Sequence, residues 1–410
     1  MNSLLKIGLL GCGFISDYYV ENIKKSSKQI IISCFDTNKK RLSEFSKYHN
    51  IKAAKSFIKL LKDPDINIIL NLTPSKNHYK IIKKCLEYGK SVYTEKPITL
   101  EISQTIELFN LSKEKKLILW SSPSLIFNQS SKIFRKKILP KIDTNNVTGY
   151  GYFESPPLAN LKVEKWINPS GAKWPLESEL KNGPILEHSG YLIAFFCSFL
   201  GPVKKISSIP SKIFSENEIK KLNALRRSLG NNHCITKLYF EKDTVINLII
   251  SEKTKSKRSI EIYDENISLL ISDIRDDFSS IIFNDKRLGN FISSRANRID
   301  LIARRISNFI PTPFVIPFLT TNPFTYTKRV KFNNLRILDI LKNQKPANFA
   351  LGLEAIMEYK LRKDKEPFME QFFLHCNEVT LLMDKFCKES KINSKFNLEK
   401  IQKFFAIIDK

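Results

Sequence analysis

Short apolar runs alternate with amphipathic segments through the first 122 residues. The apolar runs occupy residues 7–10, 30–34, 66–72, 92–93 and 117–120. Each is too short for a helix and has few polar positions, which predicts strands buried on both faces. The longer segments between them have helical spacing, as in residues 99–113. Strands alternating with helices predict an α/β domain with a doubly wound parallel sheet over residues 1–122.

The pattern changes after residue 122 and predicts an α+β domain over residues 123–364. The basic amphipathic residues 127–139 predict a helix leading into it, and the alternating residues 147–154 predict its first strand. A long loop over residues 155–182 precedes the apolar helix expected in NGPILEHSGYLIAFFCSFLGPV. Further strands are expected at residues 236–240, 244–251, 258–263 and 267–274. Consecutive strands predict a largely antiparallel sheet, and residues 365–410 are expected to form C-terminal helices.

A glycine-rich turn follows the first apolar run. Gly11 and Gly13 separate this run from an amphipathic segment, and the second apolar run ends at Asp36. Glycine permits the tight turn and lets a pyrophosphate approach the backbone where the next helix begins. Ser16 takes the place of a third small residue, and serine is small enough for close helix–strand packing. The order of strand, turn, helix, strand and acid predicts a dinucleotide-binding unit.

The acid favours one cofactor over another. Asp36 follows Ser16 by about 20 residues, where a carboxylate accepts hydrogen bonds from ribose hydroxyls. A carboxylate there also repels a 2′-phosphate, so we expect NAD, with NADP less favoured. Thr73-Pro74 and Glu95-Lys96-Pro97 end two further strands. Because the carboxyl ends of parallel strands meet at one edge of the sheet, we expect these segments to lie beside the ligand.

Composition sets limits on the setting of the protein. The chain has 410 residues, of which 42% are hydrophobic, and its apolar runs fall short of the ~20 residues of a membrane-spanning helix. The N-terminus predicts a strand and not a signal peptide. Seven scattered cysteines without a CxxC pair predict a reducing cytoplasm and no metal site.

The net charge of +26 has several interpretations. A solvated lysine-rich surface is one, and attraction to an anionic substrate, a membrane surface or nucleic acid are others. No zinc-finger or RNA-binding aromatic pattern is present, so we expect no nucleic-acid partner. Residues 294–324 combine a basic amphipathic segment with a proline-rich apolar stretch. This segment either packs on the sheet, forms an oligomer contact or makes a peripheral membrane contact.

Three spaced motifs together resemble the Gfo/Idh/MocA oxidoreductases. Their pattern is Gly-x-Gly-x-x-Ser/Ala, then Thr-Pro-x-x-x-His, then Gly-Lys-x-Val-x-x-Glu-Lys-Pro. The chain carries it at Gly11, Gly13, Ser16, Thr73, Pro74, His78, Gly89, Lys90, Val92, Glu95, Lys96 and Pro97. The resemblance implies NAD(P)-dependent hydride transfer at a hydroxyl carbon of a sugar, polyol or nucleotide sugar, and a homo-oligomer formed through the second sheet. The implied cofactor-binding residues are Gly11, Gly13, Phe14, Ile15, Asp36, Thr73, Pro74, His78, Glu95 and Lys96.

The resemblance makes Lys96 the residue that polarises the substrate hydroxyl, although alone it would be a surface lysine paired with Glu95. The family usually has an acid and then a His or Tyr around Gly190, where this chain has His188 and Leu192. An imidazole has a pKa suited to accepting the hydroxyl proton, so we expect His188 to do so. Glu187 and Tyr191 are the alternatives.

Further residues are candidates for substrate contact. Trp166 and Trp174 lie in the long loop, where they either stack on a sugar or anchor the loop. Asn128 stands where many family members have an arginine. A surface-polysaccharide precursor would suit the basic chain. Because the acid and the arginine are both changed, the alternative is a cofactor-binding scaffold without turnover.

Overall fold

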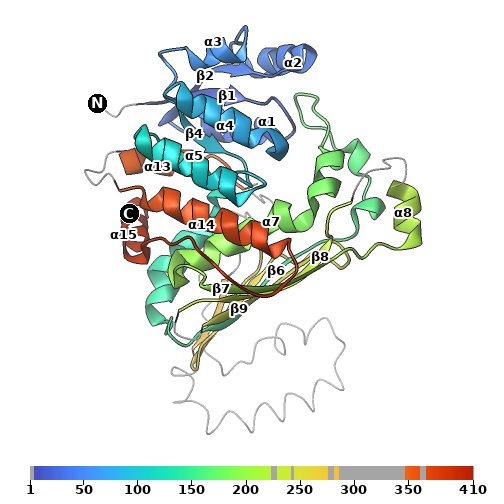
Figure 1. Ribbon diagram of the computed structural model, residues 1–410, viewed down its shortest axis with the longest axis vertical. Helices are drawn as coiled ribbons and strands as arrows, with labels where there is room; N and C mark the ends of the chain where they lie inside the picture. The colour runs from blue at the N-terminus through green and yellow to red at the C-terminus, as the bar shows by residue number, and fades with distance from the viewer. Residues whose placement is uncertain are drawn as a thin grey trace, which may run out of the picture.

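The apolar runs of the N-terminal part pair as a parallel sheet, as predicted (Figure 1). The computed structural model describes residues 4–222, 229–241, 244–275, 281–285, 347–360 and 366–409. In spatial order, the first sheet consists of β2 (Gln29–Phe35), β1 (Leu5–Leu10), β3 (Ile68–Asn71), β4 (Ser91–Thr94) and β5 (Leu119–Ser121). β3 and β4 are buried along their whole length. The strand order reverses beside β1, which is where sheets of this type bind ligands.

Helices connect these strands as the apolar spacing predicts. They are α1 (Ser16–Lys24), α2 (Lys39–His49), α3 (Phe57–Leu61), α4 (His78–Glu87) and α5 (Ile102–Glu114). A turn of 3-10 helix, η1 (Ser75–Asn77), precedes α4. α3 begins only at Phe57, since Ala53 before it forms a parallel bridge with Cys34 of β2.

The basic segment that enters the second domain is broken and not one helix over residues 127–139. It consists of η2 (Ser124–Phe127), α6 (Gln129–Ile133), the π-helical η3 (Phe134–Ile138) and η4 (Leu139–Lys141). Asn128 separates the first two because its extended backbone ends η2 and its side chain caps α6, accepting from the Ser131 backbone at 2.7 Å. The proline of η4 lies at its first turn, where the missing N–H costs nothing.

The second sheet has eight strands within the described residues. In spatial order they are β12 (Ile281–Asp285), β11 (Ile267–Ile271), β10 (Ile260–Tyr263), β6 (Thr148–Glu154), β9 (Val245–Ser251), β8 (His233–Tyr239), β7 (Lys205–Ser211) and β13 (Cys387–Lys391). The β6–β9 pair is parallel and the other pairs are antiparallel, so the sheet is largely antiparallel, as expected.

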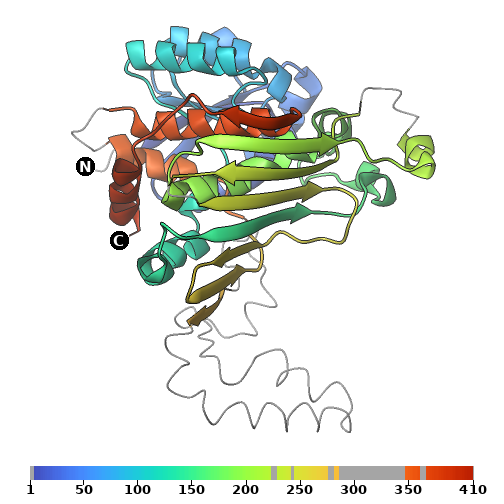
Figure 2. The ribbon, with the colours of Figure 1, turned by 60° about the horizontal axis from the view of Figure 1, so that its bottom comes forward.

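The two faces of the second sheet differ. On one face lie α7 (Leu176–Leu200) and α14 (Phe368–Met383), and no helix among the described residues covers the other, open face (Figures 1 and 2). The strands alternate accordingly, with Ile246, Leu248 and Ile250 of β9 fully buried. Ile209 and Ile235 are 55% and 46% exposed, so the open face presents apolar side chains.

The C-terminal helices join the two sheets. They are α13 (Leu351–Lys360), α14 and α15 (Leu398–Ile408), and α14 packs against both α5 and α7. Asn377 of α14 accepts from the Ile98 backbone at 2.8 Å and donates to Thr105 at 3.0 Å. A short helix, α8 (Glu216–Leu222), lies at the end of the second sheet opposite to α13 and α15, at the right of Figure 1. Of the described helices, none has both the length and the apolar content to cross a membrane. The basic and proline-rich residues 294–324 lie outside the described part of the chain.

Candidate active site

A cavity of about 1280 Å³ lies where the carboxyl ends of the parallel strands face α7. Most of the predicted cofactor residues line it, namely Gly11, Gly13, Phe14, Ile15, Asp36, Thr73, Pro74, Glu95 and Lys96. The second domain contributes Trp166, Trp174, Glu187, His188 and Tyr191 to the same wall. Predicted residues from both domains therefore share one cavity.

The glycine turn has the shape that a pyrophosphate requires. Gly11 has a φ of +94°, and a Cβ there would lie 2.8 Å from the carbonyl oxygen of Leu72. At Gly13 a Cβ would meet no atom within 4 Å, so the space beside its backbone is open. The Ser16 hydroxyl donates to the Gly13 carbonyl at 2.5 Å, which closes the turn onto α1. These residues fit the phosphates of a dinucleotide.

Asp36 is held at the end of β2 by two backbone donors. Its Oδ2 accepts from Cys12 N and its Oδ1 from Asn38 N, each at 2.8 Å. A carboxylate oxygen accepts more than one hydrogen bond, so Asp36 retains capacity for ribose hydroxyls. Arg41, the nearest arginine in sequence, does not line the cavity.

His78, an expected cofactor contact, is not among the residues that line the cavity. Its side chain is buried, and its ring nitrogens lie 2.8 and 2.7 Å from the carbonyl oxygens of Pro97 and Thr73. Burial lowers the pKa of the imidazole, against the effect of these two carbonyls. His78 therefore joins the turn after β3 to the turn after β4.

Lys96 and Glu187 form an ion pair across the cavity. Lys96 Nζ lies 2.5 Å from Glu187 Oε2, and Asn182 donates to the other carboxylate oxygen at 2.6 Å. Burial opposes the charge on Lys96, but Glu187 together with Tyr191, Glu179 and Glu95 outweighs it and raises the pKa of the ammonium group. The Lys96–Pro97 peptide is cis. Lys96 thus lies at the carboxyl edge of β4 as a protonated amine.

His188 is a neutral base in the same cavity. Its ring stacks on Phe153 with centroids 4.2 Å apart and an interplanar angle of 14°. Its Nδ1 is buried without a hydrogen-bond partner in the described part of the chain. Burial, together with the positive charge of Lys96, lowers the pKa of His188 well below its usual 6.5. The imidazole is therefore uncharged near neutral pH and free to accept a proton.

A kink in α7 directs these side chains into the cavity. Gly183 has a φ of +72°, and a Cβ there would lie 2.2 Å from the carbonyl oxygen of Asn231. Pro184 follows at the first position of the restarted helix, where proline is tolerated. Glu187, His188 and Tyr191 then occupy its first two turns. Burial raises the pKa of Tyr191, which makes it a hydrogen-bond donor and not a base.

Residues that sequence reasoning missed surround this group. Glu179 lines the cavity from the first part of α7, and burial raises the pKa of its carboxyl. Burial also raises the pKa of Glu252 to about 8, with the charge of Glu187 adding to the effect. Tyr19, fully buried in α1, donates to Glu95 at 2.7 Å. The one feature of the sequence that could have pointed to Glu179 is that it lies eight residues before Glu187 in the same segment.

Of the three residues predicted only as substrate contacts, two line the cavity and one does not. Trp166 and Trp174 line the cavity and meet edge to face, with centroids 5.2 Å apart. Asn128, by contrast, is 2% exposed and does not line the cavity, and its side chain caps α6. Arg275 also lines the cavity, with its guanidinium 5.4 Å from the Phe153 ring centroid.

Known proteins resemble the chain most clearly in its first domain. The family model "Oxidoreductase family, NAD-binding Rossmann fold" matches residues 5–122. The chain is 24% identical over 135 residues to myo-inositol 2-dehydrogenase of Thermotoga maritima, which covers 33% of this chain and 40% of that protein. It is 21% identical over 283 residues to an uncharacterised oxidoreductase of Synechocystis, covering 65% and 71%. The chain thus spans less than half of the first of these relatives.

Solved structures share the whole fold at low identity. The WlbA dehydrogenase of Bordetella pertussis, in complex with NADH and UDP-GlcNAcA, has a TM-score of 0.64 and 12% identity, covering 96% of this chain and 99% of that one. The 3-ketoreductase KijD10 of Actinomadura kijaniata, in complex with NADP, has a TM-score of 0.63 and 13% identity, covering 92% and 96%. The two-domain architecture is therefore a known one.

Proposed function

The chain belongs to the Gfo/Idh/MocA oxidoreductase family through residues 5–122, and we propose that it is an NAD-dependent dehydrogenase of a sugar, polyol or nucleotide sugar. One observation carries this proposal. Lys96, from the parallel sheet, and His188, from α7, line the same cavity as the glycine turn. A protonated amine and a neutral base beside a dinucleotide site are the groups that alcohol oxidation requires.

The roles of the two residues follow from their charges. In the oxidation direction, the substrate hydroxyl proton moves to the neutral imidazole of His188. The Lys96 ammonium group stabilises the developing alkoxide, and the carbonyl forms as the C–H bond breaks. A bound nicotinamide supplies the hydride acceptor for that bond. Glu187 keeps Lys96 charged and in place. One carboxylate oxygen of Glu187 accepts from Lys96, and the other accepts from Asn182, which fixes the carboxylate.

The acid at the end of β2 favours NAD over NADP. The Asp36 carboxylate lines the cavity, where it would repel a 2′-phosphate. Arg41 cannot offset this, because it donates from Nε to the Cys12 carbonyl at 2.7 Å and from Nη1 to the Ser170 carbonyl at 2.6 Å. NAD is therefore the expected cofactor over NADP.

Four residues that line the cavity suit a sugar with an anionic group. Trp166 and Trp174 offer aromatic faces or edges to a sugar ring, and Arg275 and Lys165 supply positive charge. A nucleotide diphosphate or a carboxylate would complement these cations. A precursor of a surface polysaccharide has this chemistry.

The test is to measure NAD and NADP binding and then NADH formation across free sugars, inositols, UDP-sugars and carboxylated sugars. We expect tighter binding of NAD and turnover of at least one member of the panel. NAD binding without turnover of any member would instead support a cofactor-binding scaffold, the alternative that the altered residues around His188 suggest.

Self-association and location are part of the same proposal. The apolar open face of the second sheet, with Ile209 and Ile235 exposed, is the expected contact between copies of the chain. Light scattering should give more than one chain per particle, and Ile235→Glu should reduce that number.

The seven cysteines are all free thiols, which supports a reducing cytoplasm.

A further inference from the structure

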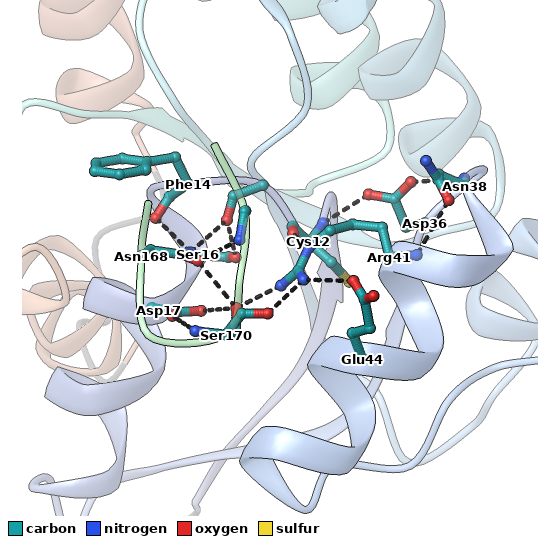
Figure 3. A network of polar contacts seen from close by, with 12 residues as sticks. Cys12, Phe14, Ser16, Asp17, Asp36, Asn38, Arg41, Glu44, Asn168 and Ser170 are labelled. Atoms are coloured by element: carbon teal, nitrogen blue, oxygen red, sulfur yellow. Dashed lines mark hydrogen bonds and ion pairs between the residues drawn. The ribbon is translucent and has the colours of Figure 1, made fainter. Parts of the chain in front are cut away.

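A loop of the second domain crosses over to the glycine turn. Residues 168–172 lie between the bridged positions Ile167 and Lys173 and reach the first domain beside α1 (Figure 1). Asn168 donates from Nδ2 to the carbonyl oxygens of Phe14 at 3.0 Å and Gly13 at 3.3 Å (Figure 3). The loop therefore contacts the glycine turn on one side, and a pyrophosphate would contact the same turn on the opposite side.

Charged residues of the first domain fix this loop. Ser170 donates to Asp17 from its backbone at 2.7 Å and from its hydroxyl at 2.6 Å. Arg41 donates to the Ser170 carbonyl at 2.6 Å and to its hydroxyl oxygen. Asp17 is 1% exposed, and its second partner is His49, whose Nε2 lies 2.9 Å from Asp17 Oδ1. Burial alone would raise the pKa of Asp17, but these hydrogen bonds lower it, so the loop is held by a buried carboxylate.

Three successive carbonyls of the turn, from Cys12 to Phe14, accept hydrogen bonds from side chains. The Cys12 carbonyl accepts from Arg41 Nε at 2.7 Å, the Gly13 carbonyl from Ser16 and Asn168, and the Phe14 carbonyl from Asn168. By contrast, the backbone N–H groups of Gly13, Phe14 and Ile15 have no partner among the described residues. Carbonyl oxygens repel an anion, whereas free N–H groups attract it.

We propose that Asn168 and Arg41 are positioning residues of the cofactor site, which hold the carbonyls of the glycine turn so that its N–H groups face the pyrophosphate. This inference rests on the proposed function. Neither residue lines the cavity, so each acts through the backbone of the turn. Since Asn168 belongs to the second domain, cofactor affinity depends on docking of the 168–172 loop. The neighbouring Trp166 and Ile167 line the cavity, so the same loop links the cofactor region to the substrate region.

The test is equilibrium binding of NADH and of ADP-ribose to the full chain and to Asn168→Ala. Losing the hydrogen bonds that orient the turn should weaken both ligands about tenfold. At saturating cofactor, kcat should stay within about twofold, because Asn168 touches no reacting group. Lys173→Ala, an exposed position of the same loop, should bind both ligands as the unmodified chain does.

Two further measurements keep the proposal falsifiable if Asn168→Ala folds poorly. Ser170→Ala removes only hydroxyl contacts and should weaken NADH less than Asn168→Ala does. In the unmodified chain, NADH should slow amide hydrogen exchange over residues 166–173. Unchanged NADH affinity in a folded Asn168→Ala, or unchanged exchange in the loop, would overturn this inference alone. Failure of the unmodified chain to bind either ligand would overturn the proposed function as well.

Discussion

Lys96 and Glu187 come from different domains and lie 2.5 Å apart, joined through a cavity that neither domain could form alone. The pair sets the charge of the residue that we assign to alkoxide stabilisation. It also explains why the turn after β4 and the kinked α7 must both be in place before the site is complete.

Removing the negative charge of Glu187 should shift the pH dependence of activity. The carboxylate raises the pKa of Lys96, so Glu187→Gln should lower that pKa, because the burial of Lys96 is then opposed only by Tyr191, Glu179 and Glu95. The ammonium form would then be lost at lower pH, and the alkaline limb of kcat/KM should move to lower pH. Glu114→Gln, at an exposed position, should leave the profile unchanged.

Replacing His188 should remove the proton acceptor. We expect His188→Ala to lower kcat by about 10²–10⁴ with little change in NADH affinity. In the unmodified chain, the pKa of His188 is well below 6.5, so activity should persist below that pH and fall only as the imidazole becomes protonated. A His188→Ala variant that kept both its rate and this acidic limb would show that another group accepts the proton.

The two glycines of the turn should respond differently to alanine. Gly11→Ala forces a positive φ and a contact of 2.8 Å with Leu72, which should cost about 1–2 kcal/mol of unfolding free energy from the backbone conformation alone. Gly13→Ala meets open space and should fold as the unmodified chain does, yet its methyl group would fill the space of the pyrophosphate. Thermal melting and NADH binding check this: equal cofactor affinity in Gly13→Ala would place the phosphates elsewhere.

The buried Glu252 should make the chain less stable in mild alkali. Its folded pKa is about 8, raised first by burial, so the folded state binds the proton more tightly than the unfolded state does. Stability is then highest below the usual glutamate pKa of ~4.3 and falls as the pH rises toward 8. Glu252→Gln should remove part of this slope and add about 1–3 kcal/mol at pH 8 relative to pH 5. Urea unfolding at both pH values measures it, and equal slopes in the two proteins would refute this assignment.

Local spacing made the first domain predictable. Each strand, turn and helix there follows its neighbour in sequence, so the positions of the glycine turn and Asp36 predict a cofactor site, whereas the role of Lys96 needed the family resemblance. The resemblance also directed attention to His188. Glu187 and Tyr191 were alternatives to His188 as the proton acceptor, and only their burial and hydrogen bonds in the structure separate the three residues.

Features that depend on distant pairing were not predictable. β13 is the polar sequence CKESK and becomes a strand only because it pairs with β7, far away in the chain. Asn168 sits in a stretch that had no signal beyond its aromatic residues. Asn128 caps a helix and His78 links two turns, and nothing in the sequence separates these structural contacts from ligand binding.

Lys96→Ala is the most direct test of the central claim, with NADH formation and NADH binding measured on the best substrate of the panel. Lys80→Ala, an exposed lysine of α4, is the matched control. The account predicts that Lys96→Ala retains NADH binding and loses NADH formation by at least about 10²-fold, while Lys80→Ala retains both. NADH formation by Lys96→Ala at the rate of the unmodified chain would contradict it.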